Sequence, residues 1–182
     1  ATWSAARCAS PKKKKGILNL VSKHRTPFYV FDEEALGNSI DSFLNAFKNE
    51  LPSFKAYYAL KINHHPLIVK YVVEKGLGLD VGSIREFNMA IEAGCNDILY
   101  FSPGKTSEDL KRVLRHSSIV TVNMDSFGEL EKLGRLTSRL KTVVKAGIRV
   151  TTDSSGDWKK FGINLINFKT FWKKAKRYPF ID

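Results

Sequence analysis

The sequence predicts an α/β protein built on a parallel sheet. Short apolar runs of four to nine residues alternate with longer segments in which apolar residues recur every three or four positions. Residues that cap helices and glycines that end them stand between the two kinds of segment. Strands that alternate with helices pair in parallel, because each helix returns the chain to the same edge of the sheet.

The first elements expected along the chain are a strand and a helix. We expect folded sequence from near Ile17 and a short strand at Phe28–Phe31. Asp32 then caps a helix that Leu51-Pro52 ends. The apolar face of this helix is formed by Leu36, Ile40, Leu44 and Phe47.

One pattern repeats from there: an apolar strand, a few polar residues and a helix. The expected strands are Phe54–Leu60, Gly78–Val81, Ile98–Phe101, Ile119–Val122 and Thr142–Val150. The helices between them are indicated by an apolar face at Leu67, Ile68, Tyr71 and Val72, by capping boxes at Ser83–Glu86 and Ser126–Glu129, and by a cap at Thr106 or Ser107. A last helix uses Phe168, Phe171, Trp172 and Ala175, and residues 179–181 begin one more strand.

The regular spacing favours a (β/α) barrel of the TIM type over a doubly wound sheet. Successive strands begin roughly 20–25 residues apart. No glycine-rich phosphate-binding turn follows the first strand, where a dinucleotide-binding fold would place it. A complete barrel needs about eight units and about 250 residues, whereas this chain supplies five units and the start of a sixth. We therefore expect residues 17–182 to be the N-terminal part of a barrel, after a flexible basic tail at residues 1–16.

Composition and charge exclude several other classes of protein. The 30 basic and 18 acidic residues give a net charge of +12, but the excess lies in residues 1–26 and 169–177. Such a distribution is typical of a basic tail and a solvated helix face, so we do not expect nucleic acid as the main partner. The Lys12–Lys15 run is either part of that tail, which we favour, or a localisation signal. No apolar run approaches the roughly 20 residues that cross a bilayer, and two cysteines fit a cytoplasmic protein.

Candidate functional residues stand where the expected strands end, which is the functional edge of a barrel. They are Lys61, Asp80, Ser83, Ser102, Lys105, Asp125 and Arg149. Lys61 follows an aromatic and aliphatic strand, and burial there would leave part of its amine neutral and able to attack a carbonyl carbon. The alternative is an ordinary surface lysine. We expect no metal site, because the adjacent His64 and His65 have no further ligand at a useful spacing.

The segment Tyr58–Asn63 resembles the cofactor-lysine motif of the fold-type III pyridoxal-phosphate enzymes. That family includes the diaminopimelate, ornithine and arginine decarboxylases. Further segments resemble motifs of the same family in the same order: Thr26–Asp32, Gly78–Ser83 with Glu86, Phe101–Lys105, Val122–Ser126, and Gly147–Val150 followed by Lys160–Ile163. The nineteen residues from Lys61 to Asp80 also match the usual interval of the family.

This resemblance implies a cofactor, pyridoxal 5'-phosphate, and roles for four residues. Lys61 would hold the cofactor as a Schiff base, while Asp80, Glu86 and Arg149 would form the pocket floor, with Arg149 paired to Asp80. The structural alternatives are an internal ion pair for Asp80 and Arg149 and a helix cap for Glu86. A histidine that stacks on the ring, a glycine-rich phosphate loop and an acid for the pyridine nitrogen are expected beyond Asp182.

The resemblance also implies an activity. The complete protein would be a homodimeric decarboxylase that releases the α-carboxylate of an amino acid as CO₂. Diaminopimelate is preferred to ornithine as substrate because the Pro-Gly-Lys and Thr-Pro-Phe-Tyr-Val-Phe motifs look more like that branch. Residues 1–182 alone are expected to be inactive. The alternatives are an amino-acid racemase or cofactor-carrier protein on the same barrel, an inactive regulatory homologue that binds a partner, and a nucleic-acid binder.

Overall fold

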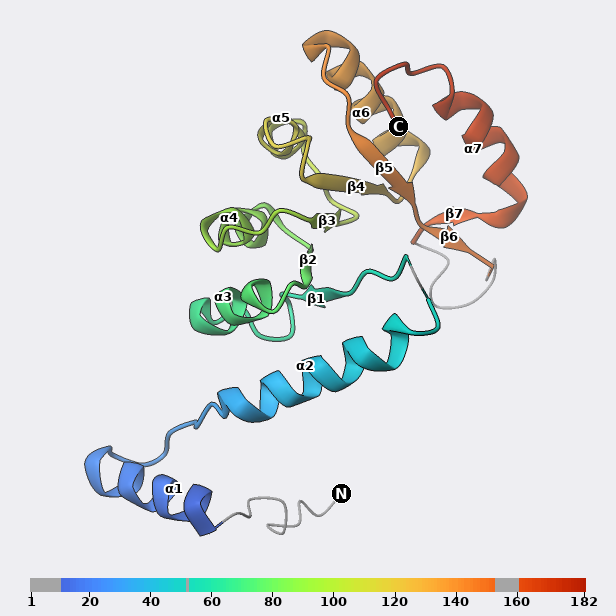
Figure 1. Cartoon of the computed structure of the whole chain (residues 1–182). Coiled ribbons are helices and arrows are strands. Elements are labelled where there is room, and N and C mark those ends of the chain that lie inside the picture. The colour runs from blue at the N-terminus through green and yellow to red at the C-terminus, as the bar shows by residue number, and fades with distance from the viewer. Residues whose placement is uncertain (1–10, 52, 153–160) are drawn as a thin grey trace. The chain divides into compact units, whose positions relative to one another are not determined.

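The computed structural model describes residues 11–51, 53–152 and 161–182, which divide into compact units at Phe47 (Figure 1). The first unit contains α1 (Pro11–Lys23) and most of α2 (Glu33–Lys48). Asp32 caps α2 as expected, since its Oδ1 accepts the Ala35 N–H at 3.0 Å. The other carboxylate oxygen of Asp32 lies 2.9 Å from the Lys13 ammonium.

The first unit differs from the sequence prediction in its strand and its tail. Residues 28–31 form no strand, and Tyr29 is fully exposed, because no neighbouring strand is there to share hydrogen bonds with them. Residues 11–16, which composition assigned to a flexible tail, form the first part of α1, since lysine is a good helix former. The rest of that expected tail, residues 1–10, lies outside the described residues.

The second unit is built on a sheet of five parallel strands (Figure 1). The strands are β1 (Tyr57–Ala59), β2 (Gly78–Val81), β3 (Ile98–Phe101), β4 (Val120–Met124) and β5 (Lys145–Ile148). They lie side by side in chain order, and every neighbouring pair is parallel. This order confirms the predicted α/β fold and its barrel-like connectivity.

A helix follows each of the first four strands. These helices are α3 (Pro66–Glu74), α4 (Ile84–Glu92), α5 (Ser107–Leu114) and α6 (Phe127–Leu140). The predicted caps are confirmed at Ser83, Thr106 and Ser126, whose side chains each accept the backbone N–H three residues further on. Gly94 ends α4 in a left-handed conformation, with φ of 74°.

Residues along β3 and β4, and from Leu79 to Val81 in β2, alternate between buried and partly buried positions. Leu79, Val81, Ile98, Tyr100, Val120 and Val122 are buried. The core of the unit therefore lies between the sheet and its helices, which are drawn along one side of β2 and β3 in Figure 1. The alternate residues, among them Asp80, Phe101 and Asn123, are only partly buried and line the opposite face, which we call the inner face. In a closed barrel this face points inward.

The last part of the unit extends the sheet. Residues 180–182 run parallel to the start of β5: Val144 bridges Ile181, and the Ala146 N–H donates to the Asp182 carbonyl at 2.7 Å. The strand expected to begin at Pro179–Ile181 is thus found only as an isolated bridge at Ile181. Before it come β6 (Val150–Thr151), which pairs in parallel with β7 (Ile163–Asn164), then a short 3₁₀ turn, η2 (Leu165–Asn167), and α7 (Phe168–Ala175).

Candidate cofactor site

Lys61 lies just past the carboxyl end of β1, where the sequence placed it. Ala59 is in register with Asp80, and the Leu60 N–H donates to the Asp80 carbonyl at 3.0 Å. Lys61 itself lies in the turn that follows β1, and its positive charge acts on the Asp80 carboxyl group. The burial that we expected for Lys61 is not found, because its side chain is exposed in the turn after β1.

Asp80 is the acidic neighbour of Lys61. Burial raises the pKa of the Asp80 carboxyl group, the positive charge of Lys61 opposes that rise, and the negative charge of Glu86 adds to it. The three side chains are therefore close enough to act on one another electrostatically. Two acidic groups beside one amine form a compact charged cluster at the carboxyl edge of β1 and β2.

Glu86 both caps a helix and faces this cluster. Its backbone N–H donates to Ser83 Oγ at 3.2 Å, while its Oε2 accepts the N–H of Gly82 at 2.7 Å. The predicted capping box thus closes on Gly82, one residue before the cap. The capping and pocket roles are compatible, because the closure holds the carboxylate at the end of β2.

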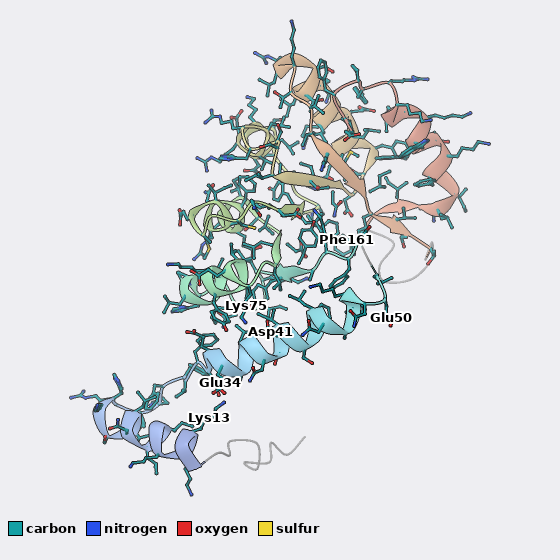
Figure 2. All side chains as sticks on the ribbon, in the orientation of Figure 1. Lys13, Glu34, Asp41, Glu50, Lys75 and Phe161 are labelled. Carbon is teal, nitrogen blue, oxygen red and sulfur yellow. The ribbon has the colours of Figure 1, made fainter. Side chains whose placement is uncertain are left out.

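Arg149 follows β5 and does not form the ion pair expected for it. Its Nη1 lies 3.7 Å from Oδ1 of Asp125, and the ion pair with Asp80 is not present among the described residues. Its guanidinium carbon lies 5.1 Å from the ring centre of Phe101 and 4.7 Å from that of Phe161, which is labelled in Figure 2. The aromatic contacts place a planar cation over the inner face.

The register of the sheet explains the change of partner. Met124 is in register with Ile148, so Asp125 and Arg149 follow at the same level on adjacent strands. Asp80, in contrast, is level with Lys145 when the register is followed across β3 and β4. Arg149 is four residues beyond that level, and β2 is separated from β5 by about 14 Å in the direction across the strands.

A second polar cluster lies between the sheet and the helices. Lys105, after β3, is only 2% exposed, and its ammonium lies 3.1 Å from Oε2 of Glu129 in the first turn of α6. It also donates to the Ser102 carbonyl oxygen. Burial lowers the pKa of Lys105, and the negative charge of Glu129 opposes that shift. The same Oε2 accepts the Asp125 N–H at 2.7 Å.

Sequence reasoning placed Lys105 and Asp125 at strand ends but treated Glu129 only as part of a cap. Glu86 and Glu129 occupy equivalent positions after β2 and β4, three residues past a capping serine. This repeated spacing in the sequence could have predicted that Glu129, like Glu86, faces the end of a strand.

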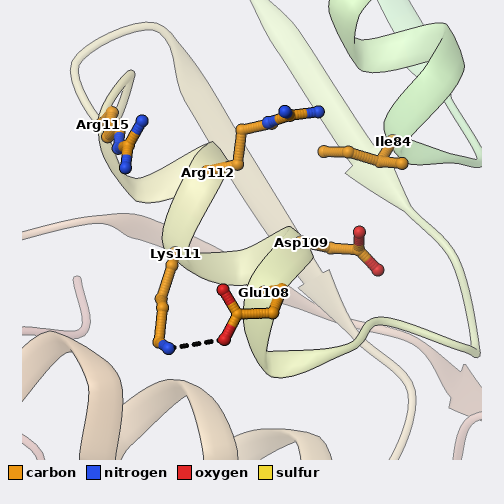
Figure 3. A pocket seen from close by; sticks show the side chains of 6 residues that line it. All are labelled: Ile84, Glu108, Asp109, Lys111, Arg112 and Arg115. Atoms are coloured by element: carbon orange, nitrogen blue, oxygen red, sulfur yellow. Dashed lines mark hydrogen bonds and ion pairs between the residues drawn. The ribbon is translucent and has the colours of Figure 1, made fainter.

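A hollow of about 360 Å³ lies away from these residues, between α4 and α5 (Figure 3). Its lining includes Ile84, Arg112 and Arg115, together with the surface ion pair between Lys111 and Glu108. None of the four predicted site residues lines it. Residues 11–51, 53–152 and 161–182 contain no group of three or more ligands placed to hold a metal ion.

The residues present fit a carbonyl cofactor that is bound through an amine. A lysine with an exposed side chain stands at a strand end beside two carboxylates. An arginine stacked on an aromatic ring lies over the inner face. Taken with the parallel sheet, these features define the chain as part of an α/β barrel that binds a cofactor at the carboxyl edge of its strands.

Comparison with known proteins identifies the family. Residues 37–179 match the family described as "Pyridoxal-dependent decarboxylase, pyridoxal binding domain". The chain belongs to this family, and the predicted cofactor, pyridoxal phosphate, is confirmed as that of the family.

Individual relatives cover most of this chain but only part of their own length. Diaminopimelate decarboxylase of Aquifex aeolicus is 32% identical over 139 residues, which are 75% of this chain and 32% of that protein. Ornithine decarboxylase of Leishmania donovani is 25% identical over 156 residues, 84% of this chain and 21% of that protein. The chain thus spans about a third of the length of the diaminopimelate decarboxylases it matches.

Solved structures agree on the fold. The crystal structure of Helicobacter pylori diaminopimelate decarboxylase complexed with L-lysine superposes with a TM-score of 0.78 at 25% identity, covering 91% of this chain and 44% of that one. The enzyme from M. jannaschii gives a TM-score of 0.80 at 22% identity, with 91% and 42% covered, which supports the fold alone. No helix in the described part of the chain is long and apolar enough to cross a membrane.

Proposed function

We propose that this chain is the N-terminal, cofactor-binding part of a pyridoxal-phosphate-dependent decarboxylase that acts on a diamino acid, diaminopimelate or ornithine. The observation that carries the proposal is the placement of Lys61 beside Asp80 and Glu86 at the carboxyl edge of the sheet. Family membership supports the reaction class, and the relatives include diaminopimelate and ornithine decarboxylases. The lysine bound to the Helicobacter pylori protein supports a substrate with a second amino group.

Lys61 would hold the cofactor through its side-chain amine. The bound cofactor supplies an electron sink, which accepts the electron pair left on the α-carbon when CO₂ departs. Asp80 and Glu86 hold negative charge beside the amine, and the raised pKa of Asp80 allows that carboxyl group to keep a proton at a higher pH than an ordinary aspartate. Arg149, stacked on Phe101, fixes a positive charge on the same face.

Two further expectations belong to this proposal. The complete protein would act as a homodimer on a small amino-acid substrate, and it would be cytoplasmic. Pyridoxal phosphate is anionic, so the basic character of the chain does not conflict with its binding.

The test is chemical labelling of the natural full-length protein. Borohydride reduction in the presence of pyridoxal phosphate, followed by peptide mapping, should place the adduct on Lys61, and Lys61→Ala should abolish it. Lys70→Ala, which removes another exposed lysine on α3, is the matched control and should retain the adduct. An adduct on Lys105 or Lys160 would contradict the assignment; Lys160 lies outside the described residues.

Substrate assays then separate the candidates. CO₂ release should be measured with diaminopimelate, ornithine, lysine and arginine under identical conditions. We expect diaminopimelate to give the highest kcat/KM. A labelled protein that releases CO₂ from none of them would refute the decarboxylase and favour a carrier or racemase.

A further inference from the structure

Four charged residues, two carboxylates between a cation at each end, run from the helix layer to the inner face. The contacts pass from the Lys105 ammonium to Glu129 Oε2 at 3.1 Å, from that oxygen to the Asp125 N–H at 2.7 Å, and from Asp125 Oδ1 to Arg149 Nη1 at 3.7 Å. Lys105, Glu129 and Asp125 are 2%, 6% and 7% exposed, whereas the Arg149 side chain is 30% exposed. Only the arginine therefore reaches the open face.

Asp125 is the unusual member of this series. Its Oδ1 is buried and has no hydrogen-bond partner among the described residues. A buried carboxylate oxygen without a hydrogen bond is costly, and such an atom calls for an explanation. Two cations lie near Asp125. Arg149 Nη1 is 3.7 Å from Oδ1, and the Asp125 charge opposes the lowering of the Lys105 pKa by burial.

Among the described residues, the Arg149 side chain contacts two aromatic rings and one carboxylate. The ring centres of Phe101 and Phe161 lie 5.1 and 4.7 Å from its guanidinium carbon, a contact that is less directional than a hydrogen bond. Asp125 is its ion-pair partner among the described residues. Asp125 is itself anchored through its backbone, because its N–H donates to Glu129, and Glu129 is ion-paired with Lys105.

We propose that Asp125 is a positioning residue, which fixes the Arg149 guanidinium over the inner face so that Arg149 can meet the cofactor or substrate. This inference rests on the proposed function. Asp125 touches neither the cofactor lysine nor its acidic neighbours; it acts through Arg149. The buried Lys105–Glu129 pair anchors the aspartate and so couples the helix layer to the site.

The test is a double-mutant cycle in the full-length holoenzyme, with Asp125→Asn and Arg149→Met alone and combined. The amide is close in shape to the carboxylate but carries no charge. Each single variant should weaken pyridoxal phosphate binding about tenfold, with the same change in the absorbance spectrum of the bound cofactor. Because Asp125 acts through Arg149, the double variant should bind the cofactor no more weakly than Arg149→Met alone.

Asp109→Asn provides the matched control. Asp109, drawn in Figure 3, accepts hydrogen bonds from Thr106 at the start of α5. These bonds involve neither Asp125 nor Arg149. This variant should lower the thermal midpoint without changing the cofactor affinity or spectrum.

Three outcomes would overturn the proposal. The first is that Asp125→Asn lowers the thermal midpoint but leaves both cofactor readouts unchanged, as a change at a purely structural residue would. The second is that the effect of Asp125→Asn persists in full in the Arg149→Met background, which would mean that it acts independently of Arg149. If the cofactor adduct still formed in Lys61→Ala, the proposed function would fail as well. If Lys61→Ala lost the adduct but the Asp125 and Arg149 variants bound the cofactor normally, only this inference would be rejected.

Discussion

Removal of the Glu129 charge should destabilise the protein strongly, because it leaves a buried lysine unpaired. Lys105 is 2% exposed, and both carboxylate oxygens of Glu129 lie within hydrogen-bonding distance of its ammonium, at 3.1 and 3.3 Å. After Glu129→Gln the ammonium keeps the neutral Ser102 carbonyl as a partner. Loss of one member of a buried ion pair costs about 3–5 kcal/mol. We expect about 3 kcal/mol, since the amide oxygen can still accept the Asp125 N–H.

The assay is urea unfolding of the full-length protein followed by circular dichroism, compared at a constant m-value. Glu131→Gln is the matched control: Glu131 lies in the same helix, and its partners Lys174 and Arg135 are at the surface, so its midpoint should barely move. Lys105→Met in the Glu129→Gln background should recover much of the lost stability, because the unpaired buried charge is removed. Equal effects of the two glutamine variants would refute the reasoning.

Three other predictions follow from packing, titration and the open sheet. Gly134→Ala should cost about 1–3 kcal/mol of stability, because its new methyl group would overlap the Tyr178 ring, whereas Gly128→Ala in the same helix has room and should stabilise it slightly. Burial raises the pKa of Tyr57 to about 12, so its contribution to stability should be complete below pH 10 and vanish as the pH rises through about 12; Tyr57→Phe should abolish this pH dependence of urea unfolding. Purified residues 1–182 with pyridoxal phosphate should release no CO₂ from diaminopimelate, because further groups of the site are expected beyond Asp182. Turnover of roughly 1 per second would contradict that expectation.

The strands were predictable where turn residues bound them on both sides. Gly78–Val81 and Ile98–Phe101 match the structure at both ends. The expected strand Thr142–Val150 contains β5 but is longer than it, because Val150 belongs to β6, which pairs with β7 and not with β4. Phe28–Phe31 has strand-like residues but pairs with no other strand among the described residues. Apolar pattern indicates which residues can pair, and the fold decides which of them do.

The candidate site could be predicted in position but not in pairing. A strand-end lysine, an aspartate one strand away and a capping glutamate lie where the motifs put them. The partner of Arg149 was wrong because it depends on strand register. The sequence does not reveal that register, since a shift of two residues keeps the same side chains inside. Buried pairing between Lys105 and Glu129 also depends on how α6 returns to the end of β3.

The two charged groups on the inner face belong to opposite ends of the described sheet. Lys61, Asp80 and Glu86 gather at β1 and β2, whereas Asp125 and Arg149 gather at β4 and β5. Four strand spacings separate β1 from β5, or about 19 Å along an open sheet. Phe101 on β3 lies between the two groups. Arg149 stacks on the Phe101 ring, and the Phe101 carbonyl oxygen lies 3.6 Å from the point where a Cβ on Gly82 would stand. When a sheet of this kind curls into a barrel, inward-pointing side chains of opposite strands converge. Closure would therefore bring the amine of Lys61 and the guanidinium group of Arg149 toward one ligand. Along the sheet of the described residues, these two groups stand at strands that are not neighbours.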